Sequence, residues 1–353
     1  TLAFKDVAMQ LLGNFYEFYL SKNSKNINII VATSGDTGAA AIDAIKGKKN
    51  VNIFVLHPHN KVSPVQRKIM STVKENNVFN IAIEGNFDDC QNLVKAMFAD
   101  KDFSNSINMS GVNSINWARI IAQAVYYFYT YFLIKDKKSI NFSVPTGNFG
   151  DVYAGYLSKK MGLPINKLIV ATNKNDILHR AISTGKYEVE TVFETNSPSM
   201  DIQVASNFER LIYDLNDFDD IETKDVMIKI KDEGKYIFAK NRLEKIRKDF
   251  LSESMNEEEV IETIKNIYDK YKVILDPHTA IGLGALNKIN IEGDNIVLAT
   301  AHPCKFPDAI DKSILIKPSL PSELQYIMDK KEYYDIVPNN VSKTKQYIKD
   351  KLK

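Results

Sequence analysis

The segment Asn141–Asp151 (NFSVPTGNFGD) constrains the fold of this chain more than any other segment. An apolar run, Ile140–Val144, meets the glycine-containing turn Thr146–Gly150. A helical pattern then extends from Asp151 to Met161, and a second apolar run follows at Lys167–Thr172. Strand, turn, helix and strand in this order predict a βαβ unit.

The turn in this unit can bind an anion. Its glycines let the backbone approach a ligand closely, and the amides at the start of the following helix point into the same space. Such a place suits a phosphate dianion, so Thr146–Gly150 is a candidate phosphate site. A plain turn with Asp151 as the helix N-cap explains the motif equally well, because glycine turns before helices are common in α/β proteins.

The same alternation of strand and helix occurs earlier in the chain. The apolar run Asn26–Thr33 breaks at Ser34–Gly38, an alanine-rich helix follows at Ala39–Ile45, and Val51–Leu56 is the next expected strand. A third unit begins with a strand at Val78–Ile83 and continues into a helix near 87–99. Repeated units of this kind predict an α/β fold with mostly parallel, twisted sheets flanked by helices.

We expect two lobes, because 353 residues exceed what a single hydrophobic core usually organises. The charged segment Lys135–Lys138 separates two blocks of alternating strands and helices. The predicted division is therefore a smaller α/β lobe at 1–137 and a larger α/β lobe at 138–353. The larger lobe would include a charged, mostly helical stretch, Asp201–Lys272, a late strand at Asn295–Ala301 and a lysine-rich C-terminal helix.

Composition limits the partners and the compartment. The net charge is 46 − 44 = +2, which gives no electrostatic case for nucleic acid. The run Ile120–Ile134 is better explained as a buried helix than as a membrane span, because it carries a glutamine and several tyrosines. Two distant cysteines, Cys90 and Cys304, argue against a disulfide framework and for a reducing, cytoplasmic location.

Several familiar catalytic and binding motifs are missing. No GxGxxG follows a strand, no GxxxxGK[ST] occurs, and there is no GxSxG, so dinucleotide binding, nucleotide hydrolysis and serine hydrolase chemistry lack support. The five histidines are scattered, and we expect no metal site. Lys5 follows the apolar triplet Leu2-Ala3-Phe4, and a desolvated amine there could form a Schiff base. An ordinary surface lysine is the alternative.

Taken together, the segments of this chain resemble threonine synthase, a pyridoxal-phosphate enzyme of fold type II, the tryptophan synthase β-like group. The matching segments follow the family's order and span nearly the whole chain. They are TLAFKD (1–6), ATSGDTGAA (32–40), KVSPVQ (61–66), GNFDDCQNLVK (85–95), NSINWAR (113–119), SVPTGNFGD (143–151), ATNKND (171–176), DPHTA (276–280) and TAHPCKF (300–306). The branch of the family that this chain is most similar to has an extra N-terminal region, and we expect that region to be missing before Thr1.

The resemblance assigns roles to residues in both expected lobes. It implies that Lys5 forms the Schiff base with pyridoxal 5′-phosphate and then moves protons on the substrate. The residues implied to bind the cofactor phosphate are Gly147, Asn148, Phe149 and Gly150. Those implied to hold the substrate carboxylate or the cofactor ring hydroxyl are Ser34, Asp36 and Thr37.

Two of the implied cofactor contacts have chemical consequences. Many relatives carry Asn at the position of Asp36, and an ionised carboxylate cannot donate a hydrogen bond to the ring hydroxyl. Thr300 is implied to face the pyridine nitrogen. A neutral hydroxyl gives that nitrogen little reason to stay protonated, so the ring would be a milder electron sink. A strand-end hydroxyl bonded to the backbone is the structural alternative for Thr300.

The family's reaction converts O-phospho-L-homoserine and water into L-threonine and phosphate by β,γ-elimination and replacement, a carbon–oxygen lyase reaction. The side chains suited to the substrate phosphate lie in matching segments: Lys61, Asn113, Ser114 and Arg119. Two alternatives stay open: another fold-type-II enzyme such as a threonine or serine dehydratase, and a non-catalytic threonine-synthase-like paralogue. We expect a monomer or a homodimer.

Overall fold

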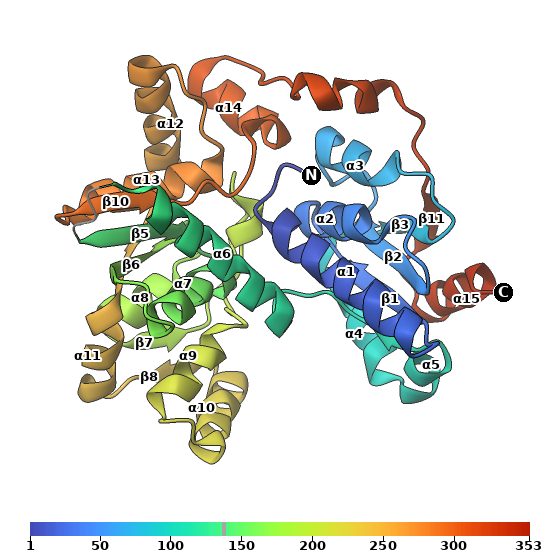
Figure 1. Ribbon diagram of the computed structural model, residues 1–353, viewed down its shortest axis with the longest axis horizontal. Coiled ribbons are helices and arrows are strands. Elements are labelled where there is room, and N and C mark those ends of the chain that lie inside the picture. Colours follow the sequence, from blue (N-terminus) through green and yellow to red (C-terminus); the bar gives the residue numbers. More distant parts are fainter. Residues whose placement is uncertain (136–138) are drawn as a thin grey trace. The chain divides into compact units, whose positions relative to one another are not determined.

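The computed structural model describes residues 1–135 and 139–353 and forms two compact units (Figure 1). Unit 1 comprises residues 1–116 and 319–353, and unit 2 comprises residues 117–318. Each unit has its own parallel sheet with helices packed against it. The α/β class predicted from the alternating pattern is therefore confirmed in both units.

The sheet of unit 1 has five parallel strands in the order β11-β3-β2-β1-β4. Their bounds are Ile27–Ala32 (β1), Val51–Pro58 (β2), Val78–Glu84 (β3), Met109–Ser110 (β4) and Asp335–Pro338 (β11). The central strands read as nearly continuous apolar runs because helices cover both of their faces. On one side of the sheet, Ile30, Phe54 and Ile81 are among the residues of a buried cluster.

Helices precede, connect and follow the parallel strands of unit 1. Their bounds are Lys5–Lys22 (α1), Asp36–Ile45 (α2), Pro64–Ser71 (α3), Phe87–Ala99 (α4), Lys101–Ser106 (α5) and Val341–Lys351 (α15), with a 3-10 helix (η3) at Ser322–Asp329. The predicted helix at 87–99 is confirmed to the residue. Its capping box pairs Asn86 and Asp89 through side chain and backbone in both directions, which sets the start of α4.

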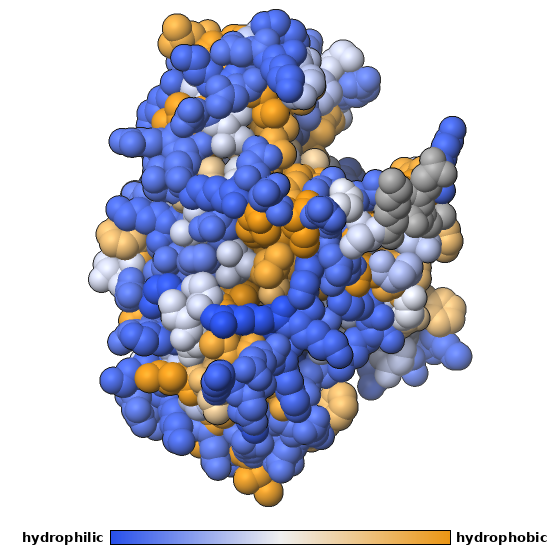
Figure 2. Space-filling view, turned by 90° about the vertical axis from the view of Figure 1, so that its left-hand side faces the viewer, coloured by the Kyte–Doolittle hydropathy of each residue, from blue (hydrophilic) through white to orange (hydrophobic). Residues whose placement is uncertain are grey.

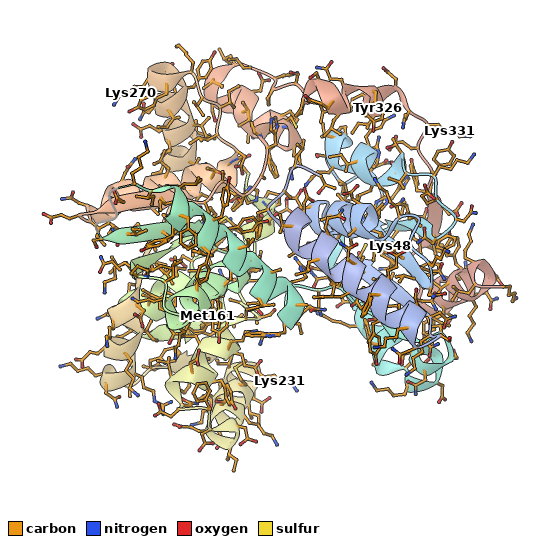
Figure 3. All side chains as sticks on the ribbon, in the orientation of Figure 1. Lys48, Met161, Lys231, Lys270, Tyr326 and Lys331 are labelled. Atoms are coloured by element: carbon orange, nitrogen blue, oxygen red, sulfur yellow. The ribbon has the colours of Figure 1, made fainter. Side chains whose placement is uncertain are left out.

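Helix α1 packs closely against α2. A Cβ built on Gly13 would lie 2.5 Å from the Ala44 carbonyl oxygen, so glycine lets the two backbones approach. Lys48, labelled in Figure 3, donates to Asn14 Oδ1 at 2.8 Å and to Glu17 Oε2 at 3.1 Å. These contacts fix the axis of α1 and hence the place of its first residue, Lys5.

The sheet of unit 2 has four parallel strands in the order β10-β5-β6-β9. Their bounds are Ile140–Pro145 (β5), Ile165–Thr172 (β6), Phe250–Ser254 (β9) and Asp294–Val297 (β10); a small antiparallel pair is formed by Lys186–Glu188 (β7) and Lys235–Ile237 (β8). The stretch Asp201–Lys272 therefore contains two strands that its charged, helical pattern did not predict. The expected late strand is shorter than predicted and ends at Val297.

The helices of unit 2 enclose an aromatic core. Their bounds are Trp117–Leu133 (α6), Gly150–Lys160 (α7), Ile177–Thr184 (α8), Phe208–Leu215 (α9), Asp220–Glu233 (α10), Lys240–Asp249 (α11), Glu257–Tyr271 (α12), Pro277–Ile289 (α13) and Pro307–Ile314 (α14), with 3-10 helices at Pro198–Met200 (η1) and Pro303–Lys305 (η2). Phe149 packs against Phe208 and Phe250, with ring centroids 5.1 Å and 5.6 Å away.

Helix α6 is buried on one face, so the prediction of a buried helix for Ile120–Ile134 holds for part of its surface. Ile120, Ala124 and Tyr127 are buried, whereas the side chains of Tyr129 and Phe132 are exposed. Elsewhere the surface is more polar. The face in Figure 2 is mostly hydrophilic, and hydrophobic residues form smaller groups within it. Isolated exposed apolar side chains are ordinary in folded proteins.

The division of the chain corrects the predicted lobes 1–137 and 138–353. The expected boundary between residues 137 and 138 lies outside the described residues. Helix α6 belongs to unit 2, because its buried face packs on α7. The C-terminal segment from Ser319 belongs to unit 1, because β11 pairs with β3 and α15 packs on α4. The pairing of β11 with β3 and the packing of α15 on α4 both join segments distant in the sequence, so local hydrophobic periodicity predicts neither of them.

Candidate active site

The first candidate turn follows β1 in unit 1. Thr33 Oγ1 accepts the backbone N–H groups of Gly35 and Gly38, each at 2.9 Å. Gly35 has φ of +147°, and a Cβ on Gly38 would lie 2.4 Å from Thr33 Cγ2. Both positions therefore require glycine, which makes the turn tight and places Asp36 at the first position of α2.

Lys5 and Asp36 come together at this turn. The Lys5 amine nitrogen lies 3.8 Å from Asp36 Oδ2 and 4.5 Å from the centre of the Phe4 ring. The Lys5 side chain is 13% exposed and the Asp36 side chain is 6% exposed. The Lys5 side chain is thus largely removed from water, with an aromatic ring and a carboxylate near its amine.

Gln66 contacts Asp36, and it was not singled out from the sequence. Its Nε2 donates to Asp36 Oδ1 at 2.9 Å, and its Oε1 accepts from Ser63 Oγ at 3.0 Å. Ser63 is the N-cap of α3 and also accepts the Gln66 N–H at 3.3 Å. The signal was available, because both residues lie in the segment KVSPVQ, but only its lysine was given a role.

The other predicted residues of unit 1 lie at varied depths. Ser34 and Thr37 are half-buried within the turn that carries Asp36. Lys61 is exposed before α3, Asn113 is exposed after β4, and Ser114 is half-buried. The Asn113 carbonyl accepts the Asn116 N–H at 3.2 Å, which closes a turn there. Three of the predicted residues, Ser34, Asp36 and Thr37, therefore lie in one turn, and the Lys5 amine lies beside that turn, near Asp36.

The second candidate turn leads from β5 into α7 in unit 2. Phe149, the residue before the helix, has φ of +63°, and its side chain makes no capping hydrogen bond to α7. The alternative of an Asp151 N-cap is therefore wrong, since Asp151 lies inside the helix. The Phe149 side chain is buried in the core, so its contribution to a ligand would come from its backbone.

Neighbouring backbone holds this turn in place. A Cβ on Gly147 would lie 2.8 Å from the Ser199 carbonyl oxygen, so a larger residue would displace the turn. The Asn148 carbonyl accepts both the backbone N–H and the Nδ2 of Asn207, each at 3.1 Å. The turn is thus rigid, and the helix amides beyond it are positioned without a capping hydrogen bond from the Phe149 side chain.

Thr300 lies beyond β10 and is 7% exposed. Its N–H donates to Thr279 Oγ1 at 3.3 Å, and the Thr279 hydroxyl donates to Asp276. Within the part of the chain that the structure describes, Thr300 Oγ1 has no hydrogen-bond partner. Thr279 and Asp276 were not singled out from the sequence, although they form part of the matching segment DPHTA. They fix the Thr300 backbone and leave its hydroxyl available.

Arg119 is almost completely buried in the first turn of α6, at 4% exposure. Its backbone carbonyl accepts Gln123 Nε2 at 2.7 Å. Burial lowers the pKa of the Arg119 guanidinium from 12.5 to about 10, so the group stays charged at neutral pH. A buried guanidinium of this kind favours an anionic ligand that can accept two hydrogen bonds.

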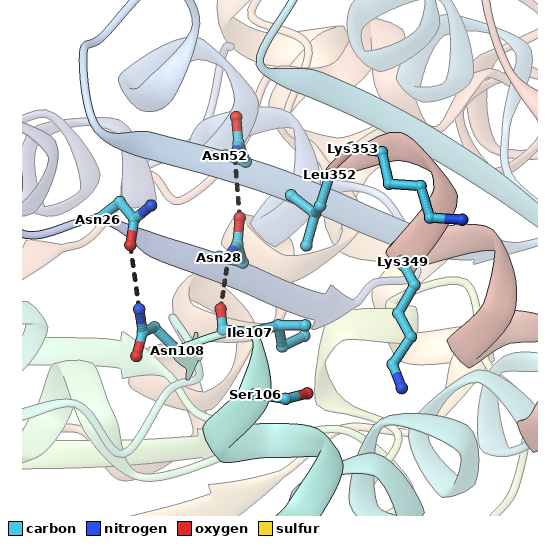
Figure 4. Close-up of a pocket in the computed structure, with 9 residues that line it drawn as sticks. All are labelled: Asn26, Asn28, Asn52, Ser106, Ile107, Asn108, Lys349, Leu352 and Lys353. Atoms are coloured by element: carbon cyan, nitrogen blue, oxygen red, sulfur yellow. Dashed lines mark hydrogen bonds between the residues drawn. The ribbon is translucent and has the colours of Figure 1, made fainter.

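A hollow at the opposite edge of the unit 1 sheet is separate from these turns (Figure 4). It is lined by residues at or before the starts of β1, β2 and β4 and by residues at the C-terminal end of the chain, and none of the predicted site residues lines it. Asn52 Nδ2 donates to Asn28 Oδ1 at 2.9 Å, and Asn108 Nδ2 donates to Asn26 Oδ1 at 3.0 Å. These amides pair with one another and serve to join the strand ends.

Two kinds of feature are absent from residues 1–135 and 139–353. No helix there is long and apolar enough to cross a membrane. No group of three or more histidine, cysteine or acidic side chains there is arranged to hold a metal ion. Cys90 and Cys304 are both buried and free.

Known proteins identify the class and then the family. A family model described as pyridoxal-phosphate dependent enzyme matches residues 1–237, which defines the chain as an enzyme of that class. A model described as the C-terminal part of threonine synthase matches residues 279–348. A threonine synthase from Pseudomonas aeruginosa is 47% identical over 352 residues, which cover 99% of this chain and 75% of that protein. The chain belongs to the threonine synthase family.

Solved structures agree with this assignment. Pyridoxal-phosphate-bound threonine synthase from Brucella melitensis matches with a TM-score of 0.96 and 45% identity, covering 99% of this chain and 76% of that chain. Threonine synthase from yeast matches with a TM-score of 0.94 and 42% identity over the same shares. The family, the type II fold and the dependence on pyridoxal phosphate that the sequence predicted are confirmed.

Proposed function

We propose that this chain converts O-phospho-L-homoserine and water into L-threonine and phosphate, with pyridoxal 5′-phosphate as cofactor. The observation that carries the proposal is the 47% identity to a threonine synthase across 99% of the chain. The family reaction needs an amine, a phosphate site for the cofactor and an anion site for the substrate. The described residues offer a candidate for each.

Three features fit the cofactor. The rigid turn Gly147–Gly150 leads into α7 without a capping hydrogen bond from the Phe149 side chain, which suits the cofactor phosphate. The buried Thr300 hydroxyl, which has no partner among the described residues, suits the neutral pyridine nitrogen. The Lys5 amine, largely removed from water, suits the aldehyde. When bound, the cofactor would supply an electron sink for negative charge at the substrate Cα.

Lys5 would act as the base of the reaction. Once the substrate amine has displaced it, its neutral amine would take the proton from Cα and then a proton from Cβ. Phosphate would leave from Cγ, a proton would be returned to Cγ, water would add its hydroxyl group at Cβ, and a proton would be returned to Cα. Asp36, 3.8 Å from the Lys5 amine, would be the nearby anion during these proton movements.

The two anionic groups of the substrate need separate partners. Arg119 would bind the substrate phosphate through two hydrogen bonds, and the exposed Lys61 would add a point charge. Asn113 and Ser114 would contribute hydrogen bonds to the same phosphate. Ser34 and Thr37, in the turn that begins α2, would hold the substrate carboxylate. These roles are supported by side-chain type and by family membership.

Borohydride reduction of the full chain after incubation with pyridoxal phosphate tests the cofactor assignment. Mass spectrometry should find the pyridoxyl group on Lys5. Turnover assays with phosphohomoserine and with threonine then test the reaction. Threonine and phosphate from phosphohomoserine support the proposal, whereas ketobutyrate from threonine alone would show a dehydratase. Absence of any pyridoxyl group would indicate a non-catalytic paralogue.

Assembly and location complete the proposal. We expect a monomer or a homodimer in the cytoplasm, with a small-molecule substrate and no nucleic-acid partner. Light scattering of the purified chain would measure its oligomeric state. A higher oligomer would contradict this part of the proposal without affecting the chemistry.

A further inference from the structure

The amide of Gln66 is held at both ends. Its Nε2 donates to Asp36 Oδ1 at 2.9 Å, while Ser63 Oγ donates to its Oε1 at 3.0 Å. An amide can satisfy both contacts in one orientation, because one end donates and the other accepts. Gln66 therefore fixes the position of one carboxylate oxygen of Asp36 relative to the start of α3.

The turn is shaped around this amide. A Cβ built on Gly35 would lie 2.6 Å from both Cδ and Nε2 of Gln66. The φ of +147° at Gly35 is also a conformation that residues with a Cβ rarely adopt. Gly35 thus leaves the space that Gln66 fills, and Gln66 is 6% exposed there.

The Asp36 carboxylate stands off from the Lys5 amine. Their separation is 3.8 Å, whereas Arg67 and Glu332 in the same unit approach to 2.8 Å. The Gln66 amide and the positive end of α2, where Asp36 is the first residue, both stabilise the charge of Asp36 at this distance. The neighbouring carboxylate of Asp6 accepts from the Thr1 amino group at 2.7 Å.

We propose that Gln66 is a positioning residue that holds the Asp36 carboxylate back from direct contact with the Lys5 amine. This inference rests on the proposed role of Lys5. An amine attacks an aldehyde in its neutral form, and a close carboxylate favours the charged form. Restraining Asp36 keeps the anion near enough to influence the amine but leaves the amine available as a nucleophile.

The test measures the protonation of Lys5 in the full chain before any cofactor is added. Trace acetic anhydride labels neutral amines, and the extent of labelling against pH gives a midpoint for each amine. Fragment ions distinguish Lys5 from the amino group of Thr1. Asp36→Asn removes the nearby negative charge and should lower the Lys5 midpoint by about 1 pH unit or more.

Gln66→Met keeps the volume of the side chain but removes the amide. Asp36 should then close on Lys5 and raise the midpoint by about half a pH unit, with correspondingly slower uptake of pyridoxal phosphate followed by visible absorbance. Gln66→Glu, which retains the shape and can share a proton with Asp36, should also give a midpoint at or above that of the wild type. Added to Asp36→Asn, Gln66→Met should change nothing further.

Gln10→Met is the matched control. Gln10 Nε2, in α1, donates to Asp43 Oδ2, in α2, at 2.8 Å. It therefore makes the same kind of amide–carboxylate contact as Gln66 does, but with a different carboxylate. Its Lys5 midpoint should equal that of the wild type. A Gln66→Met midpoint that falls or stays unchanged would overturn the inference. If the midpoints shift as expected but Lys5 carries no pyridoxyl group after reduction, the proposed function fails and the positioning role stands.

Discussion

The two glycine turns of this chain look alike in sequence but differ in how their helix starts are satisfied. In unit 1, Thr33 accepts two turn amides, and a carboxylate, Asp36, occupies the first position of α2. In unit 2, a left-handed Phe149 precedes α7, and its side chain makes no capping hydrogen bond to the helix. Each helix has a carboxylate in its first turn, Asp36 in α2 and Asp151 in α7, so the difference lies in the hydroxyl that accepts two amides of the first turn and in the left-handed residue that ends the second. The proposed function gives amine chemistry to the first turn and phosphate binding to the second.

Lys5→Ala should have the largest effect, because it removes the only group that the proposal gives both covalent and proton-transfer roles. We expect a loss of kcat of about a thousandfold or more and no cofactor-linked lysine after reduction. Turnover of phosphohomoserine and mass spectrometry measure the two effects. Lys22→Ala, in the last turn of the same helix, is the control and should behave as the wild type. Full activity of Lys5→Ala would contradict the proposal that the amine beside the first turn takes part in the reaction.

Gly147→Ala should change the conformation of the second turn, Thr146–Gly150, and leave the first turn, Ser34–Gly38, unchanged. The added Cβ would lie 2.8 Å from a backbone oxygen of Ser199, which cannot rotate away, so the turn must shift. We expect an increase of about tenfold to a hundredfold in the Kd for pyridoxal phosphate and a stability loss of about 1–3 kcal/mol. Equilibrium titration and urea unfolding measure these quantities.

Gly111→Ala is a suitable comparison for this change. Its nearest neighbour would be the edge of the Phe98 ring, a side chain, at 3.3 Å. A ring can move by a few tenths of an ångström, so the Kd for pyridoxal phosphate should stay unchanged. Equal weakening in both variants would mean that the second turn has no special part in binding the cofactor.

Much of both turns was predictable from sequence, and the reasons differ for what was not. Strand, turn and helix follow one another locally in Asn26–Ile45 and in Ile140–Met161, so periodicity and glycine placement reveal them. The pairing of β11 with β3 joins segments that are distant in the sequence. A four-residue strand is too short for its hydrophobic pattern to predict such a pairing. Gln66 lies in the matching segment KVSPVQ, which could have pointed to it, but its contact with Asp36 depends on the space that Gly35 leaves and follows from no spacing rule.

Unit 1 should also be the more acid-sensitive region, because of a histidine near the carboxyl end of β2. His57 is buried, and burial lowers its pKa from 6.5 to about 4. A depressed histidine pKa means that the unfolded chain binds the proton more readily. The stability from neutral His57 is therefore complete above pH 6.5 and declines as the pH falls towards 4. We expect a loss of about 2 kcal/mol between pH 7.5 and 5.

Hydrogen exchange followed by mass spectrometry can locate this loss. Peptides from β2 and its sheet neighbours should lose protection at pH 5, and peptides from the β5–β6 sheet should lose less. His57→Phe, which cannot take up a proton, should show a flatter dependence of unfolding free energy on pH. Identical pH dependence in this variant would exclude His57 as the cause.

Thr300→Val is the smallest and most selective change. Compared with Thr279→Val, it distinguishes an effect on the bound cofactor from an effect on the stability of the fold, because the two threonines are hydrogen-bonded to each other. The Thr300 hydroxyl is buried without a partner in the described structure, so replacing it with a methyl group should leave the unfolding free energy nearly unchanged. The Thr279 hydroxyl donates to Asp276 and accepts the Thr300 N–H, so Thr279→Val should cost about 1–3 kcal/mol. If Thr300 contacts the pyridine nitrogen, Thr300→Val should instead lower kcat by about tenfold and shift the visible absorbance of the bound cofactor. A stability loss without any change in absorbance would make Thr300 a structural hydroxyl and leave the ring nitrogen without an assigned partner.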